Sequence, residues 1–124
     1  MTKVLLIADD SPQKIVLLQH FLHKAKWNGE IVTAETSEEA MTLIDEKDIG
    51  FAFIDYYIPS ENGPAIIAYL KGKHPSAHAA LVSSSDKKSN FDEATAAGAE
   101  ACLCTTYQAD EVEKAVMEVI EEWK

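Results

Sequence analysis

Acidic side chains follow two apolar runs of strand length at separate places in the chain. Residues 4–8 lead into Asp9 and Asp10, and residues 51–54 lead into Asp55. A short apolar run bounded by turn residues is typical of a buried strand. A lone aspartate after a strand is often only a turn former, but two such strands in one parallel sheet would bring their carboxylates to the same edge. We therefore expect Asp9, Asp10 and Asp55 to meet there.

Carboxylates held a few ångströms apart repel one another, so the site is expected to keep a proton or recruit a cation. Oxygen ligands favour a hard ion, and Mg²⁺ suits a few carboxylates, a carbonyl and waters. Such an ion can bridge to a phosphoryl group, which would make Asp55 a nucleophile that accepts phosphoryl from a donor. The Ser83 hydroxyl, after a further apolar run, is placed to bind a phosphoryl oxygen, although water satisfies most strand-end serines.

Strand and helix patterns alternate along the whole chain. Strands are predicted at 4–8, 30–35, 51–55, 79–82 and 101–104. Helices are predicted from Ser11-Pro12 to Asn28-Gly29, from the capping box at 36–39, from Pro64 with Gly72 near the end, from a cap at Asn90 to Gly98, and over the stripe from Val112 to Trp123. This alternation predicts one α/β domain over 1–124, with a five-stranded parallel sheet covered on both faces. The flavodoxin-like order 2-1-3-4-5 would place the first and third strands side by side.

Composition narrows the compartment and the partners. The 124 residues carry a formal net charge of −10, which argues against direct binding to nucleic acid or an anionic membrane. No apolar stretch is long enough to span a bilayer, and Met1-Thr2-Lys3 leads into a strand rather than a signal peptide, so a cytoplasmic location is expected. Cys102 and Cys104 lie two apart in a strand, where a disulfide between them is unfavourable and no nearby ligands complete a metal site.

The pattern resembles the receiver domain of two-component response regulators over essentially the whole chain. The resemblance rests on the acidic pair after the first strand, the spacing Asp55-x-x-x-Pro59-x-x-x-Gly63, Ser83, and Ala97-Gly98-Ala99 before the fifth strand. It implies that Asp55 is the phosphoacceptor. It also implies that Asp10 binds Mg²⁺ directly with help from Asp9, that the Tyr57 carbonyl is a further ligand, and that Ser83 takes the place of the switch Ser/Thr.

Two positions depart from the family pattern. Thr105-Thr106 stands where the family usually has Lys-Pro, so a charge-assisted hydrogen bond worth roughly 1.5–3 kcal/mol is replaced by a neutral one worth about 1. We expect weaker coupling of phosphorylation to a conformational change, and a trans Thr105–Thr106 bond. Lys87 and Lys88 are possible substitutes for the cation, but solvent-exposed positions are expected for both.

Cys102 stands where many receivers have a switching aromatic, and Tyr107 is the nearby ring that could share that role. The bulky Tyr57, two residues after the phosphoacceptor, is expected either to slow dephosphorylation by shielding or to lie on the surface.

The reading that follows is a stand-alone, non-enzymatic receiver. It would accept phosphoryl on Asp55 from a sensor histidine kinase or phosphotransfer protein and signal by binding an unidentified downstream protein. One alternative is a degenerate receiver whose partner binding ignores phosphorylation, which Thr105 and Cys102 favour. Another is an aspartyl-phosphate phosphatase, but Tyr57 occupies the place of its usual second acid. Flavin binding is weaker still, because Asp9 and Asp10 would repel a phosphate.

Overall fold

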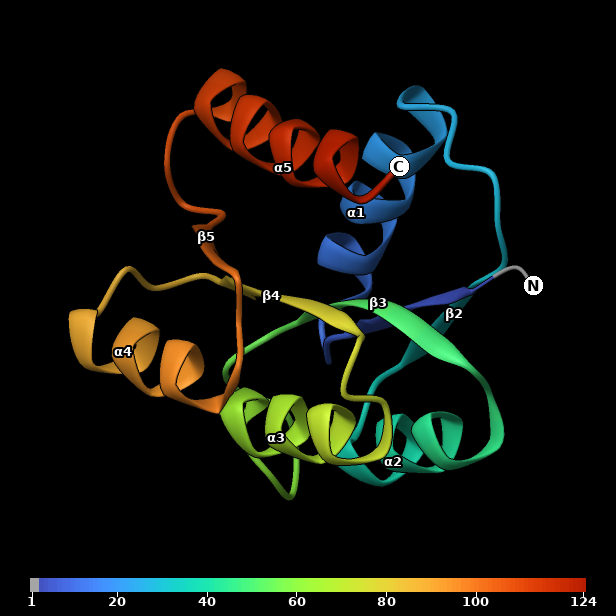
Figure 1. Ribbon diagram of the computed structural model, residues 1–124. Coiled ribbons are helices and arrows are strands. Elements are labelled where there is room, and N and C mark those ends of the chain that lie inside the picture. Colours follow the sequence, from blue (N-terminus) through green and yellow to red (C-terminus); the bar gives the residue numbers. More distant parts are fainter. Residues whose placement is uncertain (1–2) are drawn as a thin grey trace.

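The computed structural model describes residues 3–124 as alternating strands and helices (Figure 1). The strands are β1 (Val4–Ala8), β2 (Ile31–Ala34), β3 (Ile49–Ile54), β4 (His78–Ser83) and β5 (Ala101–Cys104). The helices are α1 (Pro12–Lys24), α2 (Ser37–Glu46), α3 (Gly63–Lys73), α4 (Lys88–Ala97) and α5 (Ala109–Trp123). Met1 and Thr2 lie outside the described residues. Two predictions include them: the domain over 1–124, and the start in which Met1-Thr2-Lys3 leads directly into a strand.

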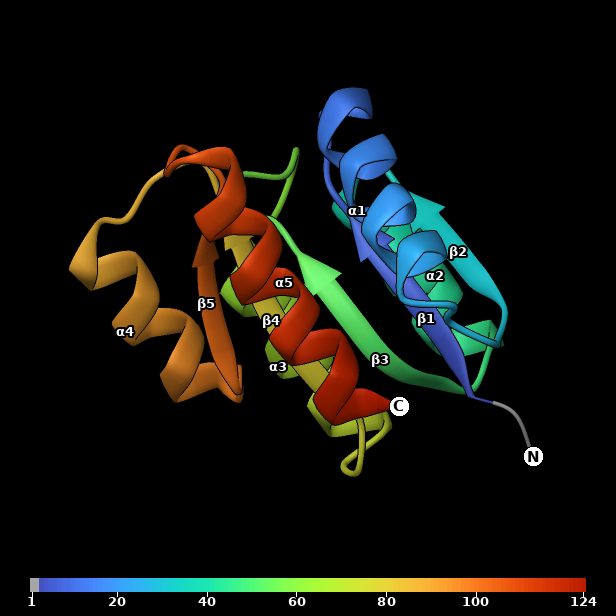
Figure 2. The same ribbon diagram turned by 90° about the horizontal axis from the view of Figure 1, so that it is seen from above.

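The five strands form one parallel sheet in the order β2-β1-β3-β4-β5, which confirms the predicted topology. Ala8 at the end of β1 pairs with Ile54 at the end of β3, so the residues that follow both strands emerge side by side. Helices α1 and α5 cover one face of the sheet, and α2, α3 and α4 cover the other (Figures 1 and 2). β2 is an edge strand, as its lower apolar content predicted.

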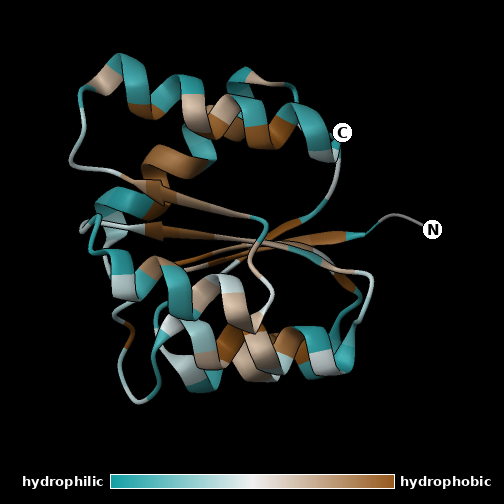
Figure 3. Ribbon diagram, turned by 60° about the vertical axis from the view of Figure 1, so that its left-hand side comes forward, coloured by the Kyte–Doolittle hydropathy of each residue, from teal (hydrophilic) through white to brown (hydrophobic). Residues whose placement is uncertain are grey.

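Two buried apolar clusters hold these layers together, one on each face of the sheet. Side chains of β1, β3 and β4 alternate between them: Leu5 and Ile7 face α1 and α5, whereas Leu6 and Ala8 face α2 and α3. Figure 3 shows the result as apolar strands between helices whose outer surfaces are hydrophilic. Because strands buried on both faces need apolar residues at every position, the continuous apolar runs in the sequence are explained.

Helix boundaries follow the predicted caps at α1 and α2 and differ at α4. Ser11 Oγ accepts a hydrogen bond from the Lys14 amide, with Pro12 as the first helical residue. Thr36 Oγ1 accepts one from the Glu39 amide, as the capping box requires. The prediction that Asn90 caps α4 is wrong, because α4 already begins at Lys88 and Asn90 is buried inside it.

Two other boundaries are also corrected. α1 ends at Lys24, before Asn28-Gly29, and the chain then turns through Lys26 with a φ of 60°. β3 begins at Ile49, two residues earlier than predicted, and ends at Ile54, so that Asp55 is the first residue beyond the strand. In the described part of the chain, no helix has both the length and the apolar character needed to cross a membrane.

Candidate acidic site at the carboxyl edge of the sheet

Three carboxylates meet where β1 and β3 end, as the sequence predicted. One carboxylate oxygen from each of Asp9, Asp10 and Asp55 lies within 4.8 Å of the others. Asp9 and Asp55 are buried, with 1% and 6% of their surface exposed, whereas Asp10 is exposed. The Asp55 amide donates to the Ala8 carbonyl at 2.9 Å, so the backbone of the β3 loop is fixed directly to the end of β1.

A close backbone approach holds the loop that carries Asp55. The Gly63 amide donates to the Tyr56 carbonyl at 2.8 Å, which closes the loop between β3 and α3. A Cβ atom at Gly63 would stand 2.2 Å from the Asp55 carbonyl oxygen, so only glycine fits there without movement of the backbone. The glycine that completes the spacing from Asp55 in the sequence therefore has a steric reason.

Burial and mutual repulsion disfavour the ionised forms of the two inner acids. Burial raises the pKa of Asp9 from its usual 3.8 to about 6; the Ser11 amide opposes this rise, the Asp55 charge adds to it, and Lys14 opposes it. Burial also raises the pKa of Asp55, which the Lys14 ammonium and the Tyr56 amide partly offset. These are the shifts that clustered, partly desolvated carboxylates should show. A nearby cation would stabilise the ionised forms of both carboxyl groups.

Lys14, which the sequence analysis did not single out, enters this cluster from the first turn of α1. Its Nζ lies 2.9 Å from Asp55 Oδ1 and 3.1 Å from Asp9 Oδ2, and it donates to the Val82 carbonyl at 3.2 Å. The charge balance of the sequence could have pointed to this lysine. Three predicted acids need a cation, and Lys14 is the lysine that follows Asp10 most closely.

The donor set fits a hard divalent ion. Asp9 Oδ2 is buried and accepts no hydrogen bond from the described residues, because its contact with Lys14 lacks hydrogen-bond geometry. Such an orphan oxygen beside two more carboxylates is suited to a metal ligand. Asp10 and Tyr57 line one hollow of about 310 Å³ beside the loop that runs to Asn62. Asp9, Asp10, Asp55 and the Tyr57 carbonyl are the groups that could hold Mg²⁺.

The remaining predicted residues lie at the ends of β4 and β5. Ser83 is fully buried, and its Oγ accepts a hydrogen bond from the Ser85 amide at 3.1 Å. Thr105 donates to the Ser83 carbonyl through both its amide, at 2.8 Å, and its hydroxyl, at 3.3 Å. The Thr105–Thr106 bond is trans, as expected. Thr105 therefore ties β5 to β4, and its hydroxyl is already committed to that contact.

The lysines and rings considered as substitutes lie outside the acidic cluster. Lys87 is exposed, and the exposed Lys88 pairs with Asp92 at 2.8 Å, as expected for solvated side chains. Tyr107 is half exposed and donates to Asp86. Cys102 and Cys104 are free thiols, and Cys102 contacts the Phe91 carbonyl. The Tyr57 ring is 58% exposed and packs edge-on against Tyr56, which agrees with the surface alternative.

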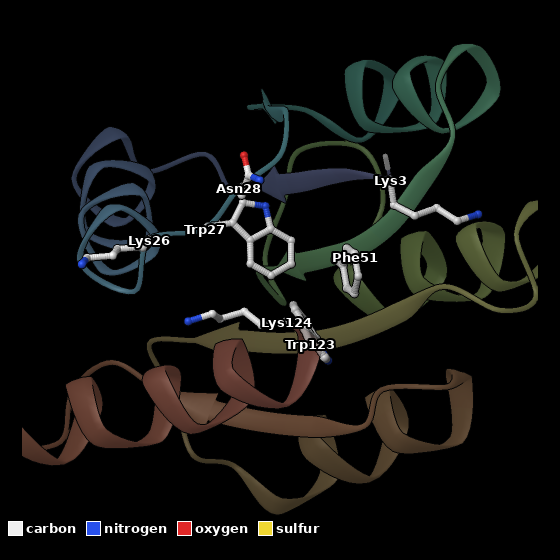
Figure 4. Close-up of a pocket in the computed structure, with 7 residues that line it drawn as sticks. All are labelled: Lys3, Lys26, Trp27, Asn28, Phe51, Trp123 and Lys124. Atoms are coloured by element: carbon white, nitrogen blue, oxygen red, sulfur yellow. The ribbon is translucent and has the colours of Figure 1, made fainter. Parts of the chain in front are cut away.

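A second hollow, of about 350 Å³, lies at the opposite end of the sheet (Figure 4). Aromatic rings of Trp27, Phe51 and Trp123 form its wall, and Lys3, Lys26 and Lys124 stand around it. Among the described residues that line it, none is an aspartate or glutamate, in contrast to the acidic cluster at the other end.

A parallel sheet in this order, with clustered acids at the switch point between β1 and β3, defines a flavodoxin-like fold. A family model described as "Response regulator receiver domain" matches residues 5–117. The chain therefore belongs to the receiver domains of response regulators, which act in two-component phosphorelay signalling.

Individual relatives agree with this assignment. Response regulator GtcR of Aneurinibacillus migulanus is 34% identical over 74 residues, which are 60% of this chain and 30% of that protein. The chain thus matches less than a third of that relative's length. A receiver domain protein of Methanospirillum hungatei JF-1 has the same fold, with a TM-score of 0.80 at 20% identity over 98% of this chain and 96% of its own.

A structure from Burkholderia pseudomallei adds a further case of the fold. That response regulator protein, described with a phosphorylated aspartic acid, a calcium ion and citrate, has a TM-score of 0.75 at 20% identity. The similarity covers 98% of this chain and 72% of that one.

Proposed function

We propose that this receiver accepts a phosphoryl group on Asp55 from a phosphohistidine of a sensor histidine kinase or phosphotransfer protein, with Mg²⁺ as the required ion. The observation that carries the proposal is the convergence of Asp9, Asp10 and Asp55 within 4.8 Å at the carboxyl edge of the sheet. The resulting aspartyl phosphate would alter the binding of a downstream protein. The domain itself would signal rather than turn over a substrate.

The contacts of Asp55 support its role as the nucleophile. Its Oδ1 accepts hydrogen bonds from Lys14 Nζ and from the Tyr56 amide, at 2.9 and 2.8 Å. These two donors orient the carboxylate. Among the described residues, no hydrogen bond is donated to Asp55 Oδ2. One oxygen is thus held in place while the other is available to attack phosphorus.

In the transfer step, an Asp55 oxygen forms a bond to phosphorus while the bond between phosphorus and the donor imidazole nitrogen breaks. The electron pair of that bond remains on the imidazole. When bound, Mg²⁺ would neutralise charge on the phosphoryl oxygens. Ser83 lies at the end of the neighbouring strand, β4. Its hydroxyl oxygen accepts a hydrogen bond from the Ser85 amide, so its hydroxyl hydrogen would be available to donate to a phosphoryl oxygen.

Phosphorylation by a small molecule tests this proposal without knowledge of the kinase. The protein is incubated with Mg²⁺ and acetyl phosphate and its intact mass is measured. We expect one added phosphoryl group, lost in Asp55→Asn and absent when the ion is chelated. Ser84→Ala, which changes an exposed hydroxyl beyond the strand end, is the control and should be phosphorylated like the wild type.

A degenerate receiver that binds its partner regardless of phosphorylation is the second candidate. The observations that favour it are the Lys14 ammonium already paired with Asp55 and the Thr105 hydroxyl committed to Ser83. The same experiment separates the two candidates. An unchanged mass in the wild type under conditions that phosphorylate another receiver would support the degenerate form and overturn phosphoryl acceptance.

A further inference from the structure

Lys14 is partly buried at a position where a lysine needs a specific reason to be. Only 14% of its side-chain surface is exposed, and lysine is rarely buried unless it is paired. It also lies in the first turn of α1, which contains no acidic residue, although the dipole of a helix disfavours a cation at this end. Local preferences therefore oppose this placement, and such conflicts are typical of functional sites.

The three contacts of the Lys14 ammonium come from three different strand ends. Asp9 follows β1, Asp55 follows β3, and Val82 is the penultimate residue of β4. Their oxygens lie 3.1, 2.9 and 3.2 Å from Nζ. The ammonium donates hydrogen bonds to Asp55 and to the Val82 carbonyl, and it forms an ion pair with Asp9. The cation consequently sits at the centre of the edge, directly before Ser83.

Among residues 3–124, Lys14 is the only cation that forms an ion pair with Asp9 or Asp55. Lys88 pairs with Asp92 on its own helix, and the polar side chain at the end of β5, Thr105, carries no charge. With all groups ionised, the three carboxylates and Lys14 have a formal charge of −2. One divalent cation would balance that charge, so the ammonium and a metal ion have separate places in the charge balance.

On the basis of the proposed function, we infer that Lys14 is the cation that binds the phosphoryl group, supplied by α1. Before transfer, Lys14 pairs with Asp55 Oδ1 and leaves the other oxygen free. After transfer, the negative charge of Asp55 has moved to the phosphoryl oxygens, and the ammonium pairs with them from its position between β3 and β4. Lys14 is thereby assigned to recognition of the phosphoryl group rather than to the structure of α1.

Binding of fluoroberyllate, a non-covalent mimic of the phosphoryl group, tests this role in the full chain with Mg²⁺ present. Mg²⁺ and fluoroberyllate are titrated separately into wild type, Lys14→Gln, Lys14→Arg and Lys88→Gln, and amide NMR shifts are followed. We expect Lys14→Gln to weaken fluoroberyllate binding about tenfold or more, because a charge-assisted hydrogen bond is lost. Its Mg²⁺ affinity should be equal or higher, because a competing positive charge has been removed.

The other variants make the result specific. Lys14→Arg keeps the charge and should retain part of the affinity for the mimic, and Lys88→Gln should match the wild type for both ligands. Equal fluoroberyllate affinity in Lys14→Gln and wild type would overturn the inference. Parallel loss of Mg²⁺ binding in Lys14→Gln would overturn it too, by showing that Lys14 only holds the site together. A wild type that acetyl phosphate fails to phosphorylate would instead refute the proposed function.

Discussion

The two ends of β3 differ sharply, because one carries a cluster of charged groups and the other a cluster of aromatic rings. At its carboxyl end the chain buries Asp55 among other charges, with Lys14 Nζ 2.9 Å from Asp55 and 3.1 Å from Asp9. At its amino end Phe51 packs against Trp27 and Trp123, with ring centroids 5.0 and 5.6 Å apart (Figure 4). One strand thus links a polar site to an aromatic cluster.

This difference divides stability from function. Desolvated carboxylates raise the free energy of the folded state unless cations compensate, as the raised pKa of Asp9 shows. Edge-on and tilted aromatic pairs contribute in the opposite sense, about 0.5–1.5 kcal/mol for each pair beyond the burial of their area. Trp123 takes part in a further aromatic pair. Its ring also packs on Phe53, the next residue of β3 on the same face, with ring centroids 4.9 Å apart. The aromatic end is therefore expected to offset the cost of the acidic end.

Removal of the Trp123 ring should have the largest effect on stability. Trp123 is 7% exposed and contacts Phe51 and Phe53, so Trp123→Ala leaves a cavity at the end of α5. We expect a loss of about 3–5 kcal/mol in the free energy of unfolding, measured by urea denaturation. Under native conditions the folded fraction should still bind Mg²⁺, because the acidic site lies at the opposite end of the strands.

Tyr107→Ala is the matched control, since this ring is 49% exposed and should contribute little to stability. Loss of Mg²⁺ binding in a Trp123→Ala protein that is still folded would show that the two ends are not separate, and would contradict the division described above.

Sequence patterns were sufficient for the fold and for the meeting of the acids. The continuous apolar runs require a sheet buried on both faces, and parallel strands bring Asp9 and Asp55 to one edge. These inferences succeed because they depend on short periodic segments and on one general rule of sheet geometry. The Asn90 cap failed because a polar residue three positions inside a helix has the same local pattern as a cap.

The contacts of Lys14 could not be predicted in this way. In the sequence, Lys14 is an ordinary polar position beside Ile15 on an amphipathic helix. Its contact with Val82, 68 residues away, arises only when α1 packs on the sheet and the Lys14 side chain reaches the ends of three strands. The cluster of Trp27, Phe51 and Trp123 has the same origin, because its rings come from three distant segments. Non-local approach of side chains is the part that periodicity does not encode.

A methyl group added at Gly63 should disturb the acidic end of the sheet through a steric clash. In Gly63→Ala the new Cβ would stand 2.2 Å from the Asp55 carbonyl oxygen, so the loop must shift. We expect a loss of about 1–3 kcal/mol in the free energy of unfolding. Because Asp55 moves with its backbone, phosphorylation by acetyl phosphate should also slow, as followed by intact mass.

Gly72→Ala provides the matched control in the same helix. A Cβ there has no neighbour within 4 Å, and alanine in place of glycine inside a helix should add roughly 0.5–1 kcal/mol. Opposite signs for the two substitutions are expected. Gly63→Ala with wild-type stability and phosphorylation would mean that the loop around Asp55 is not fixed by this contact.

The charge of Asp9 gives the effect with a defined pH dependence. The pKa of Asp9 is about 6 in the folded protein, above its usual 3.8. A folded-state pKa that is raised for an acid means that the folded protein binds more protons than the unfolded chain between these two values. Stability due to this group therefore rises as the pH falls through about 6 and is constant again below about 3.8.

Asp9→Asn mimics the protonated carboxyl and keeps an oxygen for the Ser11 amide. At pH 8 we expect the variant to be more stable than the wild type by about 1–3 kcal/mol, since a buried charge whose pKa is raised from 3.8 to about 6 is removed. At pH 5 the carboxyl of the folded protein is mostly protonated while that of the unfolded chain is still ionised, so the difference in urea midpoints should fall to roughly half and vanish only below about pH 3.8. Mg²⁺ should bind the variant more weakly at both pH values. A stability gain that stays the same at pH 8 and pH 5 would show that the gain does not come from the charge, and the acidic end would then not carry the cost assigned to it.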